Sequence, residues 1–138
     1  MPDKLFVDTS FILALINERD QYHDQAQRLS FNFEQSFLVT TAAVLLEIGN
    51  ALASAFRKEA ITIISLLRNS DRVEVVDLDT GLFEKALEMY AKYTDKTWGI
   101  VDCISFVVME ERGLTNVLTF DGDFAAAGFS LVTAVPKS

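Results

Sequence analysis

The sequence predicts an α/β fold in three layers, in which a central parallel sheet of four to five strands lies between helices. Short apolar segments alternate along the chain with longer segments of helical periodicity, and this alternation favours parallel strands joined by crossover helices. The strand candidates are apolar, as expected of strands buried on both faces. The chain has 138 residues, of which 50% are hydrophobic, so residues 1–138 suit one domain with one core.

The first half of the chain contains two predicted strands and four predicted helices. Thr9 or Ser10 can cap the first helix, and Thr40 or Thr41 can cap the third, whose apolar stripe reaches Phe56. In order, the predicted elements are a strand at 5–7, helices from about 9 to 16 and from 20 to 29, a strand at 37–40, a long helix from about 41 to 56, and a helix at 58–68.

The second half begins with a predicted edge strand at 73–76, followed by a helix that Thr80 opens. A polar loop at 94–99 leads to a segment at 100–111 that is apolar on nearly every side, which predicts a central buried helix ended by Gly113. The remaining predicted elements are a strand at 117–119, one helical turn at 123–127, a last strand at 131–133, and a frayed end at 136–138. No repeat, low-complexity segment or linker interrupts this order.

Four apolar stretches each end on, or contain, one acidic residue. Asp8 and Asp121 follow predicted strands, whereas Glu47 and Asp102 lie in the first half of helices. Carboxylates are rarely buried unless something pairs with them. Because ligands of open parallel sheets bind beyond the carboxyl ends of the strands, these four acids are expected to converge at one edge.

Carboxylates packed together repel one another, and without compensation some of them hold protons. A hard divalent cation removes the repulsion, and a set of oxygen ligands suits Mg²⁺ or Mn²⁺ better than Zn²⁺. Such ions activate water and stabilise leaving oxygens. The four acids therefore predict a metal-dependent hydrolase that acts on phosphodiester bonds.

The chain resembles the PIN-domain family and, within it, the VapC-type toxin ribonucleases of bacterial toxin–antitoxin pairs. The resemblance extends over residues 5 to about 132, and the order and spacing of its motifs are more specific than any motif alone. The motifs that carry it are FVDTS at 6–10, EIGNAL at 47–52, WGIVDCISF at 98–106 and TFDGDF at 119–124.

The resemblance implies a three-layer fold and cleavage of RNA that depends on Mg²⁺ or Mn²⁺. It also implies a homodimer and a small antitoxin, whose basic tail would suit a chain with a net charge of −8. The catalytic and metal-binding residues that it implies are Asp8, Glu47, Asp102 and Asp121. The resemblance also implies that three residues orient these acids by hydrogen bonds, namely Ser10, Asn50 and Thr119.

Three positions depart from the family pattern. Gly99 stands where serine is frequent and Val101 where threonine is frequent, so a helix cap and a hydroxyl near the site are missing. Asp123 adds an acid where basic or polar residues are common. These departures bear on affinity for RNA more than on metal binding.

Composition limits the other functions. With 12 Lys and Arg against 20 Asp and Glu, the chain lacks the basic surface that gives loose binding to nucleic acids. No apolar run is long enough for a membrane span, and the amino terminus does not resemble a signal peptide. The single cysteine, Cys103, excludes an intrachain disulfide. The expected location is the cytoplasm.

The alternative function is a non-catalytic binding module with an acidic pocket, either a degenerate PIN domain or a receiver-like domain. A receiver needs paired acids after the first strand and a late lysine, whereas Asp8 stands alone there. A phosphatase of the haloacid dehalogenase type needs an aspartate where Ser10 stands. Three of the acids also have an ordinary structural alternative: Asp8 can cap the turn after the first strand through Thr9 and Ser10, Glu47 can face solvent, and Asp121 can form a turn with its neighbouring glycine. Asp102 has no such simple alternative, because its predicted helix is apolar on nearly every side.

Several other residues have structural interpretations. Asp123 is expected to cap the helical turn that follows it, and Asp79 to cap the helix after the third strand. His23 is expected at the surface, Trp98 against the body of the protein and Cys103 in the core. The apolar segment 61–67 is expected in the core, with a dimer face as the alternative.

Overall fold

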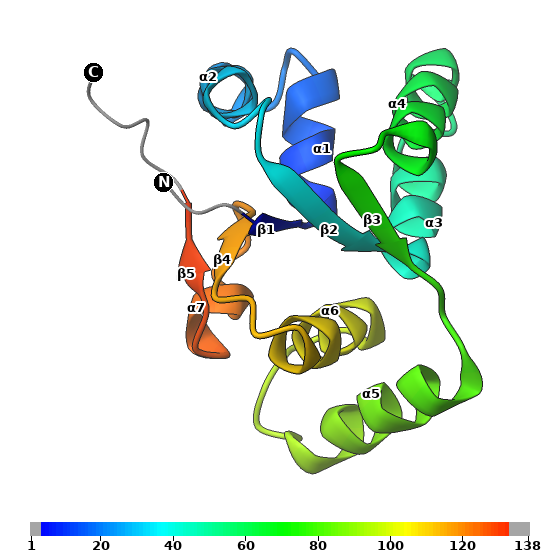
Figure 1. Cartoon of the computed structure of the whole chain (residues 1–138), viewed down its shortest axis with the longest axis vertical. Helices are drawn as coiled ribbons and strands as arrows, with labels where there is room; N and C mark the ends of the chain where they lie inside the picture. The colour runs from blue at the N-terminus through cyan, green and yellow to red at the C-terminus, as the bar shows by residue number, and fades with distance from the viewer. Residues whose placement is uncertain (1–3, 133–138) are drawn as a thin grey trace.

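The computed structural model describes residues 4–132, and within them five strands form one sheet between two sets of helices (Figure 1). All neighbouring strands are parallel, in the order β3-β2-β1-β4-β5. This arrangement confirms the predicted α/β fold and its parallel sheet. The strands are β1 (Lys4–Val7), β2 (Phe37–Thr41), β3 (Val73–Val76), β4 (Asn116–Leu118) and β5 (Ser130–Leu131).

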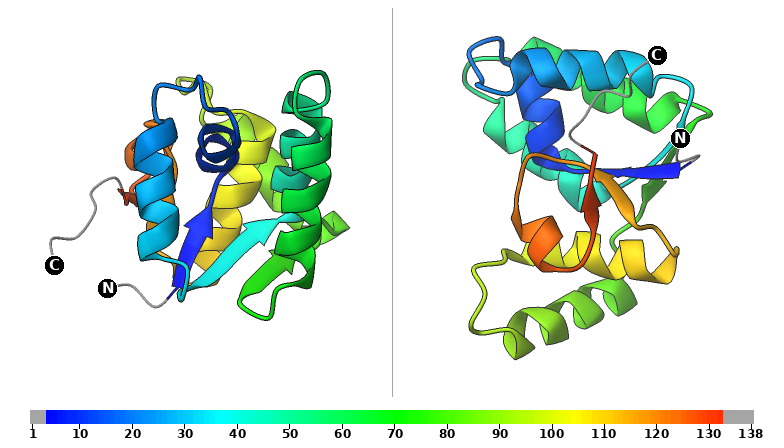
Figure 2. Two further views of the ribbon diagram at one scale, coloured as in Figure 1. Left: turned by 90° about the horizontal axis from the view of Figure 1, so that it is seen from above. Right: turned by 90° about the vertical axis from the view of Figure 1, so that its left-hand side faces the viewer.

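Helices cover both faces of the sheet, as Figures 1 and 2 show. On one face lie α1 (Thr9–Ile16), α2 (His23–Asn32), α3 (Ala42–Ala51) and α4 (Arg57–Asn69). On the other face lie α6 (Ile100–Glu111) and the short α7 (Asp123–Ala126), and α5 (Thr80–Lys92) packs against the outer side of α6.

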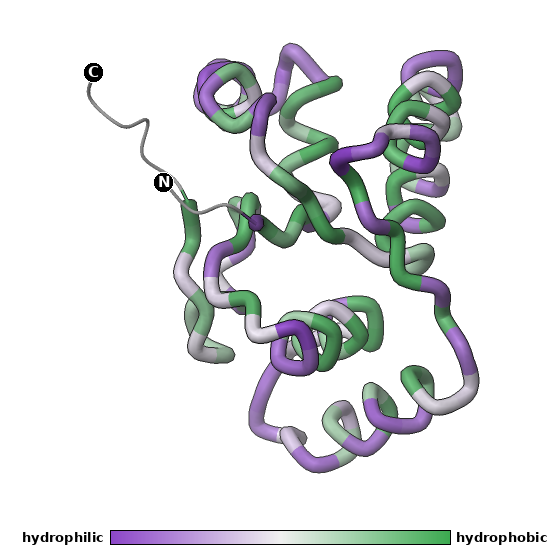
Figure 3. Tube along the Cα trace, in the orientation of Figure 1, coloured by the Kyte–Doolittle hydropathy of each residue, from purple (hydrophilic) through white to green (hydrophobic). Residues whose placement is uncertain are grey.

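The centre of the core is α6, as its sequence predicts. All seven residues from 103 to 109 are buried, because α6 lies between the sheet and α5. In Figure 3 apolar residues accordingly lie along the strands and on the helices that flank them, among them α1 and α6. Phe106 contacts the rings of Trp98, Phe124 and Phe129. This aromatic cluster fixes α6 to the loop before it and to α7, and it confirms that Trp98 packs on the body of the protein.

The order of the strands places the candidate acids side by side. The chain builds β1, β2 and β3 toward one edge of the sheet and then crosses over to add β4 and β5 on the other side of β1. Phe6 and Val7 pair with Val117 and Leu118. The backbone N–H of Asp8 then donates to the carbonyl oxygen of Leu118 at 3.1 Å. The segments that follow β1 and β4 therefore leave the sheet together, at the point where strand order reverses.

Two predicted helices have different bounds in the structure. The third helix ends at Ala51 instead of reaching Phe56, because the chain turns there so that α4 packs back on α3. The predicted helix from 20 begins only at His23, because the Asp20 carboxylate accepts a hydrogen bond from the N–H of Tyr22 at 2.8 Å and forms a turn. Both differences arise from turns that helical periodicity does not report.

The helix caps also correct some of the predictions. Asp8, rather than Thr9 or Ser10, caps α1, because its carboxylate accepts from the N–H of Ser10, as the structural alternative for this acid predicts. Thr41 caps α3, and Asp79 caps α5 through the N–H of Leu82 at 2.8 Å, as predicted.

His23 and the segment 61–67 are only partly as predicted. His23 is half-buried rather than at the surface, and its Nδ1–H donates to the carbonyl oxygen of Ala14 at 2.8 Å. In the segment 61–67, Leu67 is buried in the core whereas Ile61 and Leu66 are more than half exposed. Cys103 is buried in the core, as predicted.

The last predicted strand lies partly outside the described residues. The structure shows β5 at Ser130–Leu131, whereas Thr133 and the predicted frayed end at 136–138 lie beyond residue 132. The chain's start at 1–3 also lies outside the described part. Within residues 4–132, every helix is too short or too polar to cross a membrane.

Candidate metal centre

The Asp8 carboxylate lies at the carboxyl end of β1 and is 3% exposed. The hydroxyl of Thr119 donates to its Oδ2 at 2.7 Å, and the hydroxyl of Ser10 lies 2.9 Å from the same oxygen. Among the described residues, Oδ1 has no such hydroxyl partner. Two of the residues expected to orient an acid, Ser10 and Thr119, therefore do bind one, and they bind the same one.

Ser10, in the first turn of α1, and Thr119, in the loop after β4, also join the two segments that leave the sheet at β1 and β4. The Ser10 hydroxyl accepts from the N–H of Phe120 at 3.0 Å, and the Thr119 hydroxyl accepts from the N–H of Asp121 at 3.0 Å. The two hydroxyl oxygens are 2.9 Å apart. Because these bonds hold the start of α1 to the loop after β4, the positions of Asp8 and Asp121 are fixed relative to each other before any ligand binds.

Burial raises the pKa of Asp8 above its ordinary value, and the hydrogen bonds from Thr119 and Ser10 act in the opposite direction. Burial disfavours the charged form of a carboxyl, whereas donors to the carboxylate favour that form. Asp8 is therefore a desolvated acid that needs a positive partner when it is ionised.

Asp102 lies in the first turn of α6 and is half-buried. The N–H of Gly99 donates to its Oδ2 at 3.1 Å. The pKa of Asp102 is raised to about 7, mainly by burial and in addition by the charges of Asp8, Asp121 and Glu47, whereas the hydrogen bond from Gly99 acts in the opposite direction. The other three predicted acids therefore all lie within electrostatic reach of Asp102.

Glu47 reaches this site from α3. It is half-buried, and its Oε1 accepts a hydrogen bond from the Thr9 hydroxyl at 2.5 Å. The sequence predicts Thr9 as a candidate helix cap, and its contact with Glu47 is a role that this prediction does not include. The position of Thr9 directly after Asp8 could have indicated this role, because neighbouring residues at the carboxyl edge of the sheet can both face the site.

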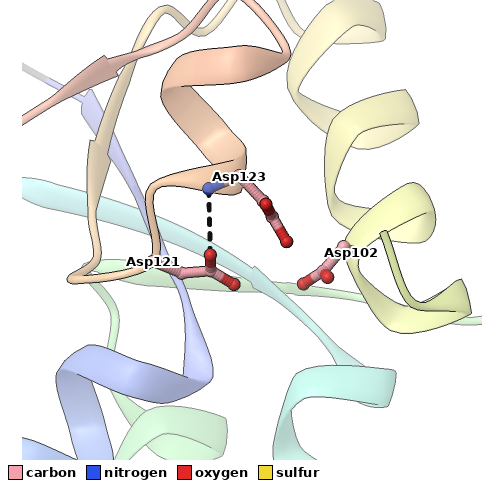
Figure 4. Close-up of side chains that lie close together, drawn as sticks. All are labelled: Asp102, Asp121 and Asp123. Atoms are coloured by element: carbon pink, nitrogen blue, oxygen red, sulfur yellow. Dashed lines mark hydrogen bonds between the residues drawn. The ribbon is translucent and has the colours of Figure 1, made fainter. Parts of the chain in front are cut away.

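A fifth acid, Asp123, belongs to the cluster. One carboxylate oxygen from each of Asp102, Asp121 and Asp123 lies within 4.8 Å of the others, and Figure 4 shows the three side chains directed toward a common space. The prediction that Asp123 caps α7 is wrong, because Gly122 is the cap residue and Asp123 begins the helix. Instead, Asp121 Oδ1 accepts from the N–H of Asp123 at 2.9 Å. Burial, and then the charge of Asp121, raises the pKa of Asp123.

Asn50 does not join the cluster. It is exposed on α3, three residues beyond Glu47, and within residues 4–132 no hydrogen bond links its side chain to an acid. Gly99 caps α6 with an ordinary negative φ of −78°. A Cβ atom at Gly99 would meet Asp102 Oδ2 at 3.8 Å, which is an ordinary contact. The missing serine hydroxyl therefore leaves the backbone bond to Asp102 intact.

Comparison with known proteins agrees with this geometry. Residues 5–130 match the family described as PIN domain. The chain belongs to the PIN-domain family. The match covers nearly the whole chain, and the acids of the site lie inside the matched residues.

This PIN domain is similar over nearly its whole length to a named ribonuclease. It is 36% identical to the 23S rRNA-specific endonuclease VapC20 of two strains of Mycobacterium tuberculosis, over 91% of this chain and 95% of that protein. The crystal structure of VapC20, described as a sarcin–ricin loop cleaving toxin, superposes with a TM-score of 0.83, at 34% identity and over 91% of this chain and 96% of that one.

A more distant structure shares the fold alone. VapBC2 from Rickettsia felis, solved bound to a DNA fragment from its promoter, has a TM-score of 0.66 at 13% identity, over 93% of this chain and 96% of that one.

Thr119 offers a direct test of the hydroxyl network in this PIN domain. Thr119→Val keeps the shape of the fully buried side chain but removes one of the hydroxyl donors to the Asp8 carboxylate and the acceptor of the Asp121 N–H. We expect unfolding free energy to fall by about 2–3 kcal/mol at pH 8, and less at pH 4, where Asp8 is closer to neutral. Urea unfolding at both pH values measures the loss. Thr119→Ser, which keeps the hydroxyl, is the control, and an equal loss in both variants would contradict the role of the hydroxyl.

Proposed function

We propose that this chain is an endoribonuclease that depends on Mg²⁺ or Mn²⁺ and serves as the toxin of a toxin–antitoxin pair. The observation that carries the proposal is the convergence of Asp8, Glu47 and Asp121 on Asp102, whose pKa is raised to about 7 by its burial and by the charges of the other three acids. Carboxylates with raised pKa values, gathered where an α/β sheet binds ligands, are typical of functional sites.

The residues present fit a hard divalent ion. The donors are carboxylate oxygens, and those of Asp102, Asp121 and Asp123 lie within 4.8 Å of one another. Asp8 and Asp102 would be the principal ligands, and Glu47 and Asp121 would bind directly or through water. When bound, such an ion neutralises the acids, acidifies a water molecule and stabilises charge on phosphate oxygens.

The protein's own residues then have separable tasks. Thr119 and Ser10 hold Asp8, and Thr9 holds Glu47, so that the acids keep their positions as charge changes. In hydrolysis, a water oxygen forms a bond to phosphorus, the bond from phosphorus to the leaving ribose oxygen breaks, and that oxygen gains a proton. Glu47 or Asp121 takes the proton of the attacking water.

The proposed substrate is ribosomal RNA. Its support is the relative named as a 23S rRNA-specific endonuclease, which is 36% identical over nearly the whole chain. The negative charge of this chain, −8, opposes RNA binding at long range, so affinity must come from the metal-loaded site and specific contacts. The enzyme would meet this substrate in the cytoplasm.

The proposed protein partners are a second copy of the chain and a small antitoxin with a basic tail. Large apolar side chains on α3 and α4 remain exposed, among them Leu46, Ile61 and Leu66. Apolar groups gathered on neighbouring helices support an interface on this side of the molecule. The acidic surface supports a partner of opposite charge.

Cleavage of RNA by the purified protein tests the proposed function. The substrates are 23S rRNA and a hairpin with the sequence of its sarcin–ricin loop, incubated with Mg²⁺, with Mn²⁺ or with excess EDTA. We expect a discrete pair of products with either metal and none with EDTA, seen by gel and mapped by primer extension. Metal-independent cleavage would contradict the proposed mechanism. Binding of the hairpin with no cleavage under any condition would favour the non-catalytic binding module.

A further inference from the structure

We propose that the pocket beside the candidate metal centre is a nucleobase subsite, in which one unpaired base of the RNA stacks on the ring of Tyr22. This inference rests on the proposed function, since it assigns part of the RNA to that site. The pocket has a volume of about 590 Å³, and Ser10 and Asp121 line it together with Tyr22 and Phe120. Because Ser10 and Asp121 also belong to the hydrogen-bond network of the metal centre, the pocket and the centre are continuous.

One wall of the pocket is a stack of aromatic rings. The rings of Tyr22 and Phe120 are nearly parallel, at an angle of 2°, with centroids 4.5 Å apart. Phe120 lies in turn against the buried ring of Phe11, with centroids 6.1 Å apart. Phe120 covers one side of Tyr22, yet Tyr22 is still 38% exposed. A base that enters the pocket can therefore extend the stack, which is the usual way proteins hold unpaired bases.

The loop that carries Tyr22 is held in place before RNA binds. Asp20 Oδ1 accepts from the N–H of Tyr22 at 2.8 Å, and the N–H of Asp20 donates to the carbonyl oxygen of Asn17 at 3.0 Å. At the other side of Tyr22, His23 Nδ1 donates to the carbonyl oxygen of Ala14 at 2.8 Å. Fixing the ring in advance reduces the entropy that is lost when a base binds.

The polar groups of the pocket suit a base rather than the RNA backbone. Asp20 and Asp121 are carboxylates, which repel phosphate but accept hydrogen bonds from the amino and imino groups of bases. Gln21 adds an amide that both donates and accepts. A neutral, planar ligand with N–H donors on its edge matches this lining, and a nucleotide next to the scissile phosphate can supply it.

Direct binding tests the subsite without requiring cleavage. The probe is the sarcin–ricin hairpin with 2-aminopurine placed at one loop nucleotide at a time, bound to the Asp102→Asn protein in Mg²⁺. Stacking on an aromatic ring lowers 2-aminopurine fluorescence, so we expect quenching at one position. Adding Tyr22→Ala should abolish this quenching and weaken binding about tenfold, whereas adding Tyr22→Phe should preserve both.

Cleavage kinetics provide a second readout in the otherwise unchanged protein. We expect Tyr22→Ala to lower kcat/KM about tenfold or more and Tyr22→Phe to stay within about twofold of the unchanged chain. Tyr90→Ala is the matched control, because Tyr90 is 50% exposed on α5, far from this pocket in the sequence and on the other face of the sheet. Melting temperatures of all variants establish that each one is folded.

The outcomes separate this inference from the proposed function. Cleavage that proceeds equally well in Tyr22→Ala, with no position quenched, overturns the subsite and leaves the ribonuclease proposal intact. Quenching that depends on Tyr22, in a protein that cleaves no RNA, supports the subsite and overturns the ribonuclease proposal. Quenching that persists in Tyr22→Ala with unchanged affinity also overturns the subsite, because the base then stacks elsewhere.

Discussion

Asp102→Asn is expected to lower RNA cleavage on the order of 10³-fold, which corresponds to about 4 kcal/mol of lost transition-state stabilisation. The substitution keeps the size of the side chain, and an amide oxygen can still accept the hydrogen bond from the N–H of Gly99. It removes the charge that faces Asp8, Glu47 and Asp121. Initial rates on the sarcin–ricin hairpin at saturating Mg²⁺ measure the effect.

The same substitution is expected to stabilise the metal-free protein. The pKa of Asp102 is about 7 in the folded chain, against an ordinary value of 3.8, so the folded state holds its proton more tightly. Binding of this proton therefore favours the folded state. The favourable contribution is complete below pH 3.8 and is lost as pH rises through 7. At pH 8 in EDTA we expect the free energy of unfolding of Asp102→Asn to be about 1–2 kcal/mol higher than that of the unchanged chain. This figure allows for solvent screening at a half-buried site.

Asp95→Asn is the matched control for both measurements. Asp95 is an exposed acid in the loop before α6, seven residues earlier, and its contact with Lys96 is long at 3.9 Å. We expect it to change neither activity nor stability appreciably. Full activity in Asp102→Asn would refute the role proposed for Asp102. A loss of stability at pH 8 would contradict the destabilising effect of its buried charge that the raised pKa indicates.

Divalent metal is expected to stabilise the protein, and more strongly at pH 8 than at pH 5.5. A ligand that binds only the folded state at a hundred times its Kd adds about 2.7 kcal/mol, which corresponds to roughly 5–10 °C in the melting temperature of a chain of this length. Protons compete with metal for the carboxylates. Because the pKa of Asp102 is about 7 and burial raises that of Asp8, this competition strengthens as pH falls below 7.

Thermal unfolding in a titration of Mg²⁺ or Mn²⁺ measures this stabilisation. KCl at the same ionic strength controls for screening of the acidic surface, which also raises the melting temperature of a chain with a net charge of −8. Asp8→Asn should lose most of the metal-specific shift. A melting temperature that responds to MgCl₂ no more than to KCl at pH 8 would count against a metal centre at these acids.

Most of the fold could be predicted from local sequence. Each strand is a short apolar segment, and α6 stands out because the apolar residues of 100–111 cover nearly every side. Such patterns depend on neighbours within one or two turns, so a single sequence contains them. The helix ends were less predictable, since the end of α3 at Ala51 depends on where α4 packs.

The candidate site was predictable in part, for a related reason. Asp8, Glu47, Asp102 and Asp121 were recognisable because each interrupts apolar sequence, and the structure brings the other three within electrostatic reach of Asp102. Thr9 and Asp123 carried no such signal, since a threonine and an aspartate beside turns are usually caps. Asn50 shows the opposite case, because sharing a helix face with Glu47 did not bring it to the acids.

The class of fold, the buried helix and the four predicted acids are all readable in the amino-acid sequence, because they follow from local patterns of polarity. Three features depend instead on how the chain folds: the segments after β1 and β4 are adjacent, Thr119 binds Asp8 across 111 positions, and Asp123 joins the cluster. They depend on the fold because strand order sets which distant segments meet. Burial and charge repulsion, and with them the pKa of Asp102, arise only after those segments have met.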